Sequence, residues 1–98
     1  MSLDAIKEKF LDKIGQNPPL KATVKFDLRD NGVIFVDTTQ TPIVINEEDN
    51  EAETVFILKQ DVLEAILDKK QDPRMAFMTG KLKVKGNMGL AMQLTSVL

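Results

Sequence analysis

The chain contains no cysteine, histidine, tryptophan or tyrosine among its 98 residues. Without cysteine it can form neither a disulfide nor a thiolate metal site. Without histidine it lacks the commonest general base and the commonest ligand of transition metals. Catalytic arrangements that pair serine or cysteine with histidine are therefore excluded. The remaining carboxylates, lysines and hydroxyls form no identifiable catalytic constellation, so we expect no enzymatic activity, no metal and no cofactor.

Long apolar runs are missing as well, because none exceeds four residues, whereas a membrane-spanning helix needs about 20. Four charged residues between positions 4 and 9 interrupt the segment in which a signal peptide would carry its apolar core. The last three residues, Ser-Val-Leu at 96–98, lack the basic residue at the centre of the peroxisomal Ser-Lys-Leu tripeptide. We therefore expect a cytoplasmic location, without a signal peptide, a transmembrane segment or a peroxisomal signal.

Composition and charge are those of a small folded domain. Hydrophobic residues make up 43% of the chain and charged residues 29%, which is typical of globular proteins. The length suits one domain, so we expect a single domain over residues 1–98. The net charge of −2 disfavours general nucleic-acid binding, which depends on neutralising phosphates. Residues 47–53 hold five acids and no base, whereas residues 54–98 hold seven bases and four acids; we interpret both segments as solvated surface.

Apolar residues at spacings of three and four predict helices over residues 3–14 and 60–70. Ser2 is placed to cap the first of them. Asp72 is placed to cap a short helix that begins at a proline, and Asn87 to cap a last helix near the C-terminus. The sequence therefore predicts helices at both ends of the chain and others between the strands.

Alternation of apolar and polar residues predicts strands at residues 20–29 and 81–85. The short apolar segments 33–37, 43–46 and 54–58 are predicted as three further strands. Asp30-Asn31-Gly32 has the composition of a tight hairpin turn with left-handed backbone positions. Because the connections among the first four strands are short, we expect these strands to form an antiparallel meander. The fold class predicted from periodicity is thus α+β.

Two segments invite a ligand assignment that their residues do not support. GKLKVKGNMGLAMQL, at residues 80–94, lacks the glycine–lysine spacing of a phosphate-binding P-loop. Its strand also has no aromatic residue on which nucleic-acid bases could stack, and lysines on an edge strand serve to prevent edge-to-edge aggregation. The acidic loop at 47–53 lacks the turn glycine and the flanking helices of a calcium-binding loop. We predict no metal and no nucleic acid at either place.

Four methionines, Met75, Met78, Met88 and Met92, fall within 18 residues of one another. Methionine is unbranched and polarisable, so it adapts to irregular or changing shapes. Each could simply fill the core. Together with Phe77 they could instead form a wall that rearranges around a flexible apolar guest, and the composition leaves both interpretations open.

Residues 73–94, PRMAFMTGKLKVKGNMGLAMQL, strongly resemble the signature of the sterol carrier protein-2 (SCP-2) family. That signature has a proline-led short helix with a phenylalanine, then Gly-Lys-Leu-Lys-hydrophobic-x-Gly-Asn-Met-Gly-Leu-Ala-Met-x-Leu, and Phe77 and the residues from Gly80 to Leu94 fill its fixed positions. The resemblance implies a five-stranded, mostly antiparallel sheet with helices packed on one face, enclosing an apolar tunnel. It also implies a non-catalytic carrier that binds fatty acids, fatty acyl-CoA, phospholipid or sterol in that tunnel.

Face alternation and helix spacing then give the residues that we expect against the guest's apolar chain: Phe26, Leu28, Phe35, Phe56, Leu63, Ile66, Phe77, Met78, Leu82, Met88 and Met92. We expect the basic residues Arg74, Lys81, Lys83 and Lys85 to be available to a polar head group or to the phosphates of CoA.

The alternative function is that of an accessory module that docks onto a partner enzyme and shapes or supplies its active site. A transient contact with a membrane is compatible with either function, and no residue pattern points to a particular oligomeric state.

Overall fold

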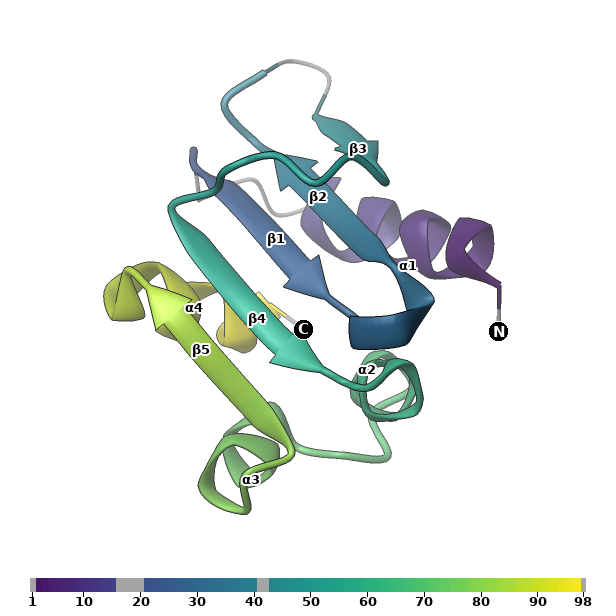
Figure 1. Cartoon of the computed structure of the whole chain (residues 1–98), viewed down its shortest axis with the longest axis vertical. Coiled ribbons are helices and arrows are strands. Elements are labelled where there is room, and N and C mark those ends of the chain that lie inside the picture. The colour runs from purple at the N-terminus through teal and green to yellow at the C-terminus, as the bar shows by residue number, and fades with distance from the viewer. Residues whose placement is uncertain (1, 16–20, 41–42, 98) are drawn as a thin grey trace.

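The computed structural model describes residues 2–15, 21–40 and 43–97. Figure 1 shows one twisted sheet with the helices behind and below it. The chain forms α1 (Leu3–Gly15), β1 (Thr23–Asp27), the 3₁₀ helix η1 (Arg29–Asn31), β2 (Val33–Asp37), β3 (Val44–Asn46), β4 (Thr54–Leu58), α2 (Gln60–Leu67), α3 (Pro73–Met78), β5 (Leu82–Gly86) and α4 (Met88–Val97). This is the predicted α+β architecture. Leu20 and Leu98, which the expected first strand and C-terminal tripeptide include, lie outside the described residues.

The five-stranded sheet has the order β3-β2-β1-β4-β5. Neighbouring strands are antiparallel except for β1 and β4, which are parallel. The expected meander of the first four strands is therefore wrong, because β4 does not return beside β3. Instead, the loop after β3 crosses the sheet and places β4 on the far side of β1 (Figure 1). A position inside the sheet, between β1 and β5, suits β4, because Phe56 is buried on one face while Val55 and Ile57 are half-buried on the other.

The predicted helix caps are present. The backbone N–H of Ala5 donates to Ser2 Oγ over 3.2 Å, and that of Arg74 donates to Asp72 Oδ1 over 2.8 Å. The N–H of Leu90 donates to Asn87 Oδ1 over 3.1 Å. Each side chain satisfies a donor that the first helical turn leaves without a partner inside the helix. The polar residues that mark helix starts in the sequence therefore do so in the structure.

The connection between β1 and β2 differs from the expected tight turn. It contains the 3₁₀ helix η1, and its positive φ angles fall at Arg29 (60°) and Gly32 (101°). The N–H of Leu28 donates to the carbonyl oxygen of Gly32 over 2.9 Å, which closes the loop. The loop is therefore longer than a two-residue hairpin, and β1 is shorter than the predicted strand 20–29.

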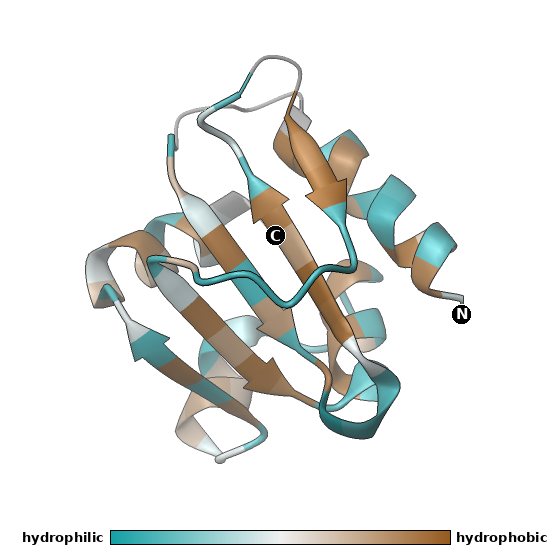
Figure 2. Cartoon of the chain, turned by 45° about the horizontal axis from the view of Figure 1, so that its top comes forward, coloured by the Kyte–Doolittle hydropathy of each residue, from teal (hydrophilic) through white to brown (hydrophobic). Residues whose placement is uncertain are grey.

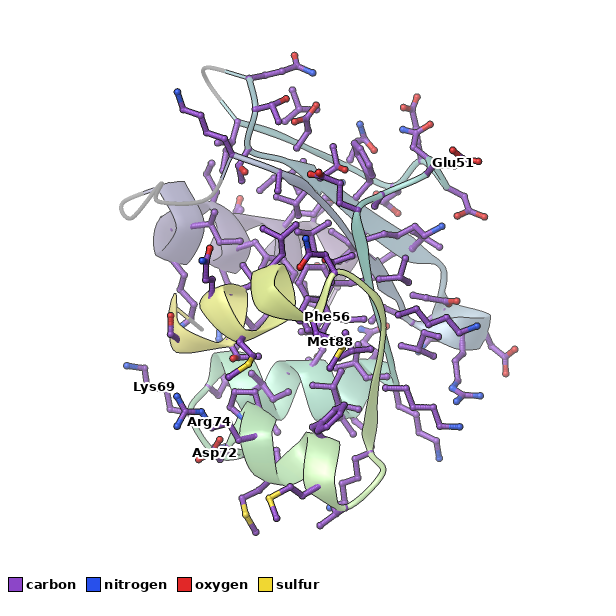
Figure 3. The ribbon with its side chains drawn as sticks, turned by 90° about the vertical axis from the view of Figure 1, so that its left-hand side faces the viewer. Glu51, Phe56, Lys69, Asp72, Arg74 and Met88 are labelled. Atoms are coloured by element: carbon purple, nitrogen blue, oxygen red, sulfur yellow. The ribbon has the colours of Figure 1, made fainter. Side chains whose placement is uncertain are left out.

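Three phenylalanines form the centre of the core. Phe26 on β1 lies 4.5 Å, between ring centroids, from Phe10 on α1 and 5.1 Å from Phe56 on β4. All three are at most 1% exposed. The side-on view in Figure 3 shows the helices together on one side of the sheet. The core therefore lies between the helices and the sheet face that carries Phe26 and Phe56.

The acidic loop, residues 47–53, crosses the opposite sheet face (Figure 1). Lys25 on β1 points to this face, and its Nζ lies 2.7 Å from Asp49 Oδ1 in the loop. At the sheet edge, Lys7 Nζ of α1 lies 2.7 Å from Glu47 Oε2, and this contact, followed by the one with Asp4, raises the pKa of Lys7. Figure 2 shows the loop as an almost continuous hydrophilic segment crossing the strands. The loop therefore crosses this sheet face while its acidic side chains remain exposed or pair with lysines.

Candidate functional site

An apolar groove lies between α3, β5 and α4, with a volume of about 250 Å³. It is lined by Pro73, Arg74, Phe77, Met78, Leu82, Val84, Met88, Ala91, Met92 and Thr95. Leu82 and Ala91 are buried, 4% and 3% exposed, whereas Phe77 and Met88 are 46% and 47% exposed. The groove thus combines buried residues with large apolar side chains that water reaches.

Local structure explains how these side chains come together. Asp72 caps α3 and Pro73 occupies its first turn, so that Phe77 and Met78 follow one helical turn later. On β5, Leu82 and Val84 share the face that meets the helices, because they pair with Leu58 and Phe56 of β4. On α4, the lining residues recur at spacings of three and four, from Met88 to Thr95, and so occupy one helix face.

Five of the eleven expected lining residues border this groove: Phe77, Met78, Leu82, Met88 and Met92. The sequence reasoning did not name four lining residues, although the pattern contained them: Pro73, Val84, Ala91 and Thr95. Val84 alternates with Leu82 on the strand, and Ala91 and Thr95 lie three residues after Met88 and Met92. Their small or half-polar side chains did not stand out as lining residues.

Five other expected residues lie in the core that is sealed under the helices: Phe26, Leu28, Phe56, Leu63 and Ile66, each at most 2% exposed. They pack against protein atoms and do not border the groove. They could meet a guest only if the helices moved apart.

Phe35 requires a correction. Its Cα pairs with that of Lys25, whereas its neighbour Ile34 pairs with Phe26. Paired residues share a face and successive residues alternate, so Phe35 points to the sheet face under the acidic loop. It therefore lies on the side away from the helices, where a guest between sheet and helices does not reach.

The four expected basic residues lie in three different places. Arg74 borders the groove and is the charged residue among its ten lining residues. Lys83 and Lys85 pair with Ile57 and Val55 and point to the face opposite Leu82 and Val84. Lys81 borders a separate polar depression of about 390 Å³, together with residues of η1 and α2. Of the four, Arg74 has the geometry of a head-group contact for a guest in the groove.

Displaced pKa values occur away from the groove. The pKa of Asp37 at the end of β2 is lowered by hydrogen bonds from Thr39 and Gln40. The pKa of Asp68 after α2 is lowered chiefly by its hydrogen bond from Lys9 of α1. Both fit structural roles, since each carboxylate accepts hydrogen bonds that hold neighbouring segments together.

Within residues 2–15, 21–40 and 43–97, no cluster of three or more aspartate or glutamate side chains could hold a metal ion. None of the helices in the same ranges is long and apolar enough to cross a membrane. Compared with the depression beside Lys81, the groove has the more apolar lining.

Comparison with known proteins identifies the family. The model of the SCP-2 sterol transfer family matches residues 4–98. The chain belongs to this family. The match confirms the resemblance drawn from residues 73–94 and extends it over almost the whole sequence.

Curated relatives of this SCP-2 chain include larger proteins. Hydroxysteroid dehydrogenase-like protein 2 of Bos taurus is 35% identical over 82 residues, which are 80% of this chain and 20% of that protein. Sterol carrier protein 2 of Rattus norvegicus is 41% identical over 54 residues, which are 55% of this chain and 10% of that protein. The chain therefore spans a fifth or less of the length of these two relatives.

Solved structures share the SCP-2 fold. Sterol Carrier Protein 2 Like 2 from Aedes aegypti superposes with a TM-score of 0.79 at 23% identity, covering 100% of this chain and 97% of that one. The Aedes aegypti sterol carrier protein-2 in complex with palmitate has a TM-score of 0.76 at 22% identity, covering 98% and 94%. These similarities confirm the five-stranded α+β fold with helices on one face.

Proposed function

We propose that this SCP-2 chain is a non-catalytic lipid carrier that holds a single fatty acyl chain in the groove between α3, β5 and α4. The observation that carries the proposal is the lining of the groove. Apart from Arg74 and Thr95, its residues are apolar. Such a surface stabilises a hydrocarbon chain by removing it from water and forms no hydrogen bonds that would select a polar guest.

The walls of the groove suit a flexible guest better than a rigid one. Met78 and Met92 are 78% and 71% exposed and have three rotatable bonds each, so they can fold over a bound chain. A sterol would need a preformed cavity closer to its own rigid shape. Fatty acids and fatty acyl-CoA are therefore the favoured ligands, ahead of phospholipid and sterol.

The groove is small for a whole acyl chain, at about 250 Å³, whereas pockets that bury a drug-sized ligand measure roughly 300–1,000 Å³. Its volume can increase at α3, because Ala76 is the buried residue of that helix. Outward movement of α3 would open the groove to Ala76, which belongs to the hydrophobic core. In this way a residue that is sealed in the present structure would join the binding surface.

The expected affinity is sufficient for a carrier. Burial of a 16-carbon chain contributes on the order of 10 kcal/mol at about 0.8 kcal/mol per methylene group, before the cost of immobilising protein and ligand. This gross energy leaves room for a dissociation constant in the micromolar range or tighter. Such affinity allows both solubilisation of the lipid and its release.

Arg74 is the proposed contact for the head group. Arg74 borders the groove, and a guanidinium group can form paired hydrogen bonds with a carboxylate or a phosphate. An acyl-CoA ligand has several phosphates and a fatty acid has one carboxylate, so salt should weaken acyl-CoA binding more strongly. Equal salt responses of the two ligands would contradict this assignment.

The structural relatives support an acyl ligand. The Aedes aegypti protein with the TM-score of 0.76 was solved in complex with palmitate, a C16 fatty acid. A second solved relative, SCP2L2 from Aedes aegypti, is palmitated and has a TM-score of 0.73. Both share the fold of this chain, and a fatty acid is accordingly the first ligand to test.

The test begins with organic-solvent extraction of the purified protein and mass spectrometry of the extract, which should reveal a stoichiometric acyl lipid. Displacement of a fluorescent fatty acid then compares Met92→Glu with Gln93→Glu. Both positions are exposed on α4, but Met92 lines the groove and Gln93 does not. Met92→Glu removes an apolar side chain that would fold over the guest and places a carboxylate beside the hydrocarbon, so it should weaken binding about tenfold or more while Gln93→Glu has little effect.

Two results would contradict the carrier function. One is an empty protein that also fails to bind the fluorescent fatty acid, which would favour the accessory docking module. The other is equal binding by Met92→Glu and the unaltered protein, which would place the ligand outside this groove.

A further inference from the structure

The methionines of this chain are concentrated in α3 and α4. Four of the five lie within residues 75–92, and the fifth, Met1, lies outside the described residues. Each of the four is between 47% and 78% exposed: Met75, Met78, Met88 and Met92. In Figure 3 the sulfur atoms, in yellow, lie around α3 and α4. A methionine that fills a core is shielded from water, whereas these thioethers are open to small oxidants.

Three of these methionines, Met78, Met88 and Met92, line the groove, whereas Met75 does not. The chain has no cysteine that could react with an oxidant first. The buried hydrophobic cluster of the described residues contains no methionine. Oxidisable sulfur is therefore placed on the binding surface and kept out of the described core.

We propose that Met78, Met88 and Met92 are a modification site for hydroperoxides, and that their oxidation to methionine sulfoxide releases the fatty acyl guest from the groove. The inference rests on the proposed carrier function and adds to it a regulation of the same site. It differs from general oxidative damage because the core is spared. The fold persists while the binding surface changes its polarity.

The oxidation step requires a hydroperoxide, ROOH, and no further reactant. The thioether sulfur attacks the terminal oxygen of ROOH, the O–O bond breaks, and an S–O bond forms. The proton of that oxygen passes to the departing oxygen, which leaves as ROH, or as water when the oxidant is hydrogen peroxide. The sulfur is oxidised by two electrons and the peroxide is reduced by two. Methionine sulfoxide reductases return the thioether, so the modification is reversible.

A sulfoxide group changes how a side chain meets a hydrocarbon. It is polar and accepts hydrogen bonds, so covering it with an acyl chain costs its hydration. Apart from Arg74 and Thr95, the other lining residues offer it no side-chain hydrogen-bond donor. The oxidised side chains therefore turn towards water instead of folding over the guest.

The experiment treats the purified protein with hydrogen peroxide, locates each sulfoxide by tandem mass spectrometry and measures displacement of a fluorescent fatty acid before and after treatment. The affinity should fall on the order of tenfold, because three apolar side chains become polar. The far-ultraviolet circular dichroism spectrum should be retained. Methionine sulfoxide reductases A and B together should restore the affinity, because each enzyme reduces one sulfoxide epimer.

Leucine substitutions separate the groove methionines from Met75. Leucine has nearly the volume of methionine and carries no sulfur to oxidise. A variant that combines Met78→Leu, Met88→Leu and Met92→Leu should have the same affinity before and after peroxide, since each protein is compared with itself. Met75→Leu should lose affinity like the unaltered protein, because Met75 is 51% exposed but does not line the groove.

Saturating palmitate tests whether the guest and the modification share one site. A bound chain covers the groove methionines, so hydrogen peroxide should oxidise Met78, Met88 and Met92 more slowly while Met75 reacts at its former rate. A fatty-acid hydroperoxide enters the groove as the guest and should oxidise the groove methionines ahead of Met75. The two arms distinguish an oxidant that arrives from water from one that is carried as lipid.

Unchanged affinity of a protein that carries the three sulfoxides would overturn the inference and leave the carrier function intact. An equal loss of affinity in the triple leucine variant would do the same, as would equal oxidation rates with and without palmitate, or loss of the folded circular dichroism spectrum. A protein that binds no fatty acid before oxidation would instead overturn the carrier function, and the proposed release with it.

Discussion

Two regions of the same sheet, its centre and its β5 end, use apolar residues in opposite ways. At its centre, under α1, the rings of Phe10, Phe26 and Phe56 are in contact and at most 1% exposed. At the β5 end, Phe77 and the methionines of α3 and α4 leave between 46% and 78% of their side-chain surface exposed. Hydrophobicity alone therefore does not distinguish a core residue from a binding residue in this chain.

The difference lies in which elements cover each of these two regions. At the centre, α1 and α2 lie over the strands, and packed rings cannot move independently of one another. At the β5 end, the short helix α3 has one buried residue, Ala76, and β5 is an edge strand. The first arrangement stabilises the fold, and the second leaves apolar surface free for a guest.

The largest expected effect comes from exchanging a phenylalanine at the sealed centre. Phe26→Ala should lower the free energy of unfolding by about 3–5 kcal/mol, because the cavity lies between two other rings. Phe77→Ala should lower it by about 1 kcal/mol or less, since that ring is already 46% exposed. Urea unfolding followed by circular dichroism measures both. Similar losses for the two variants would mean that Phe77 belongs to the core. They would contradict the distinction between a sealed centre and an open β5 end.

The next effect concerns Gly80, which precedes β5, and Gly86, the last residue of β5. An added Cβ at Gly86, where φ is +92°, would lie 2.3 Å from the backbone carbonyl oxygen of Glu53, whereas at Gly80, where φ is +80°, nothing lies within 4 Å. Gly86→Ala should therefore cost about 2–4 kcal/mol from strain and steric overlap, and Gly80→Ala about 1 kcal/mol from backbone strain alone. The same urea experiment compares them. Equal costs would show that β5 can move away from Glu53 without penalty.

The smallest expected effect is a pH dependence of the stability, which Asp37 contributes at the end of β2. Hydrogen bonds from Thr39 and then Gln40 lower the pKa of Asp37 in the folded protein. The resulting stability is fully present above the unfolded-state pKa, near 3.9, and is lost as pH falls through the lower folded-state value. Asp37→Asn should reduce stability at pH 7 by about 1–2 kcal/mol, as expected for lost hydrogen bonds to a charged group. The difference in stability between Asp37→Asn and the unaltered protein should therefore decrease as the solution is acidified.

Urea midpoints between pH 7 and pH 3 measure this dependence. Asp12→Asn on α1 is the control for the loss of one exposed negative charge. A stability gap between Asp37→Asn and the unaltered protein that stays constant over this range would show that the charge of Asp37 does not contribute.

Most secondary structure could be predicted from the sequence, because its signals are local. The caps at Ser2, Asp72 and Asn87 and the alternation along β1 and β5 depend on residues close together in the chain. The pairing of β4 with β1 could not be predicted in the same way. It joins segments that are distant in sequence, such as Phe26 of β1 and Phe56 of β4.

The candidate site was predictable in part for the same reason. Phe77, Met78, Leu82, Met88 and Met92 belong to one continuous segment with a family signature, and they do border one groove. Phe35 was misplaced because β2 is apolar on both faces, so alternation could not show which face meets the helices. Phe26 and Phe56 are the kind of large apolar residue that could line a pocket, but neighbouring rings bury them. No local sequence pattern shows that burial.

The sequence by itself determined the α+β class, the helix starts and the family, since propensity, capping and a continuous motif act over short distances. It also excluded histidine- and cysteine-dependent chemistry through composition alone. The tertiary structure decided which apolar residues are sealed and which remain open. Burial depends on coverage by elements far apart in the chain, and here the short α3 leaves one end of the sheet incompletely covered.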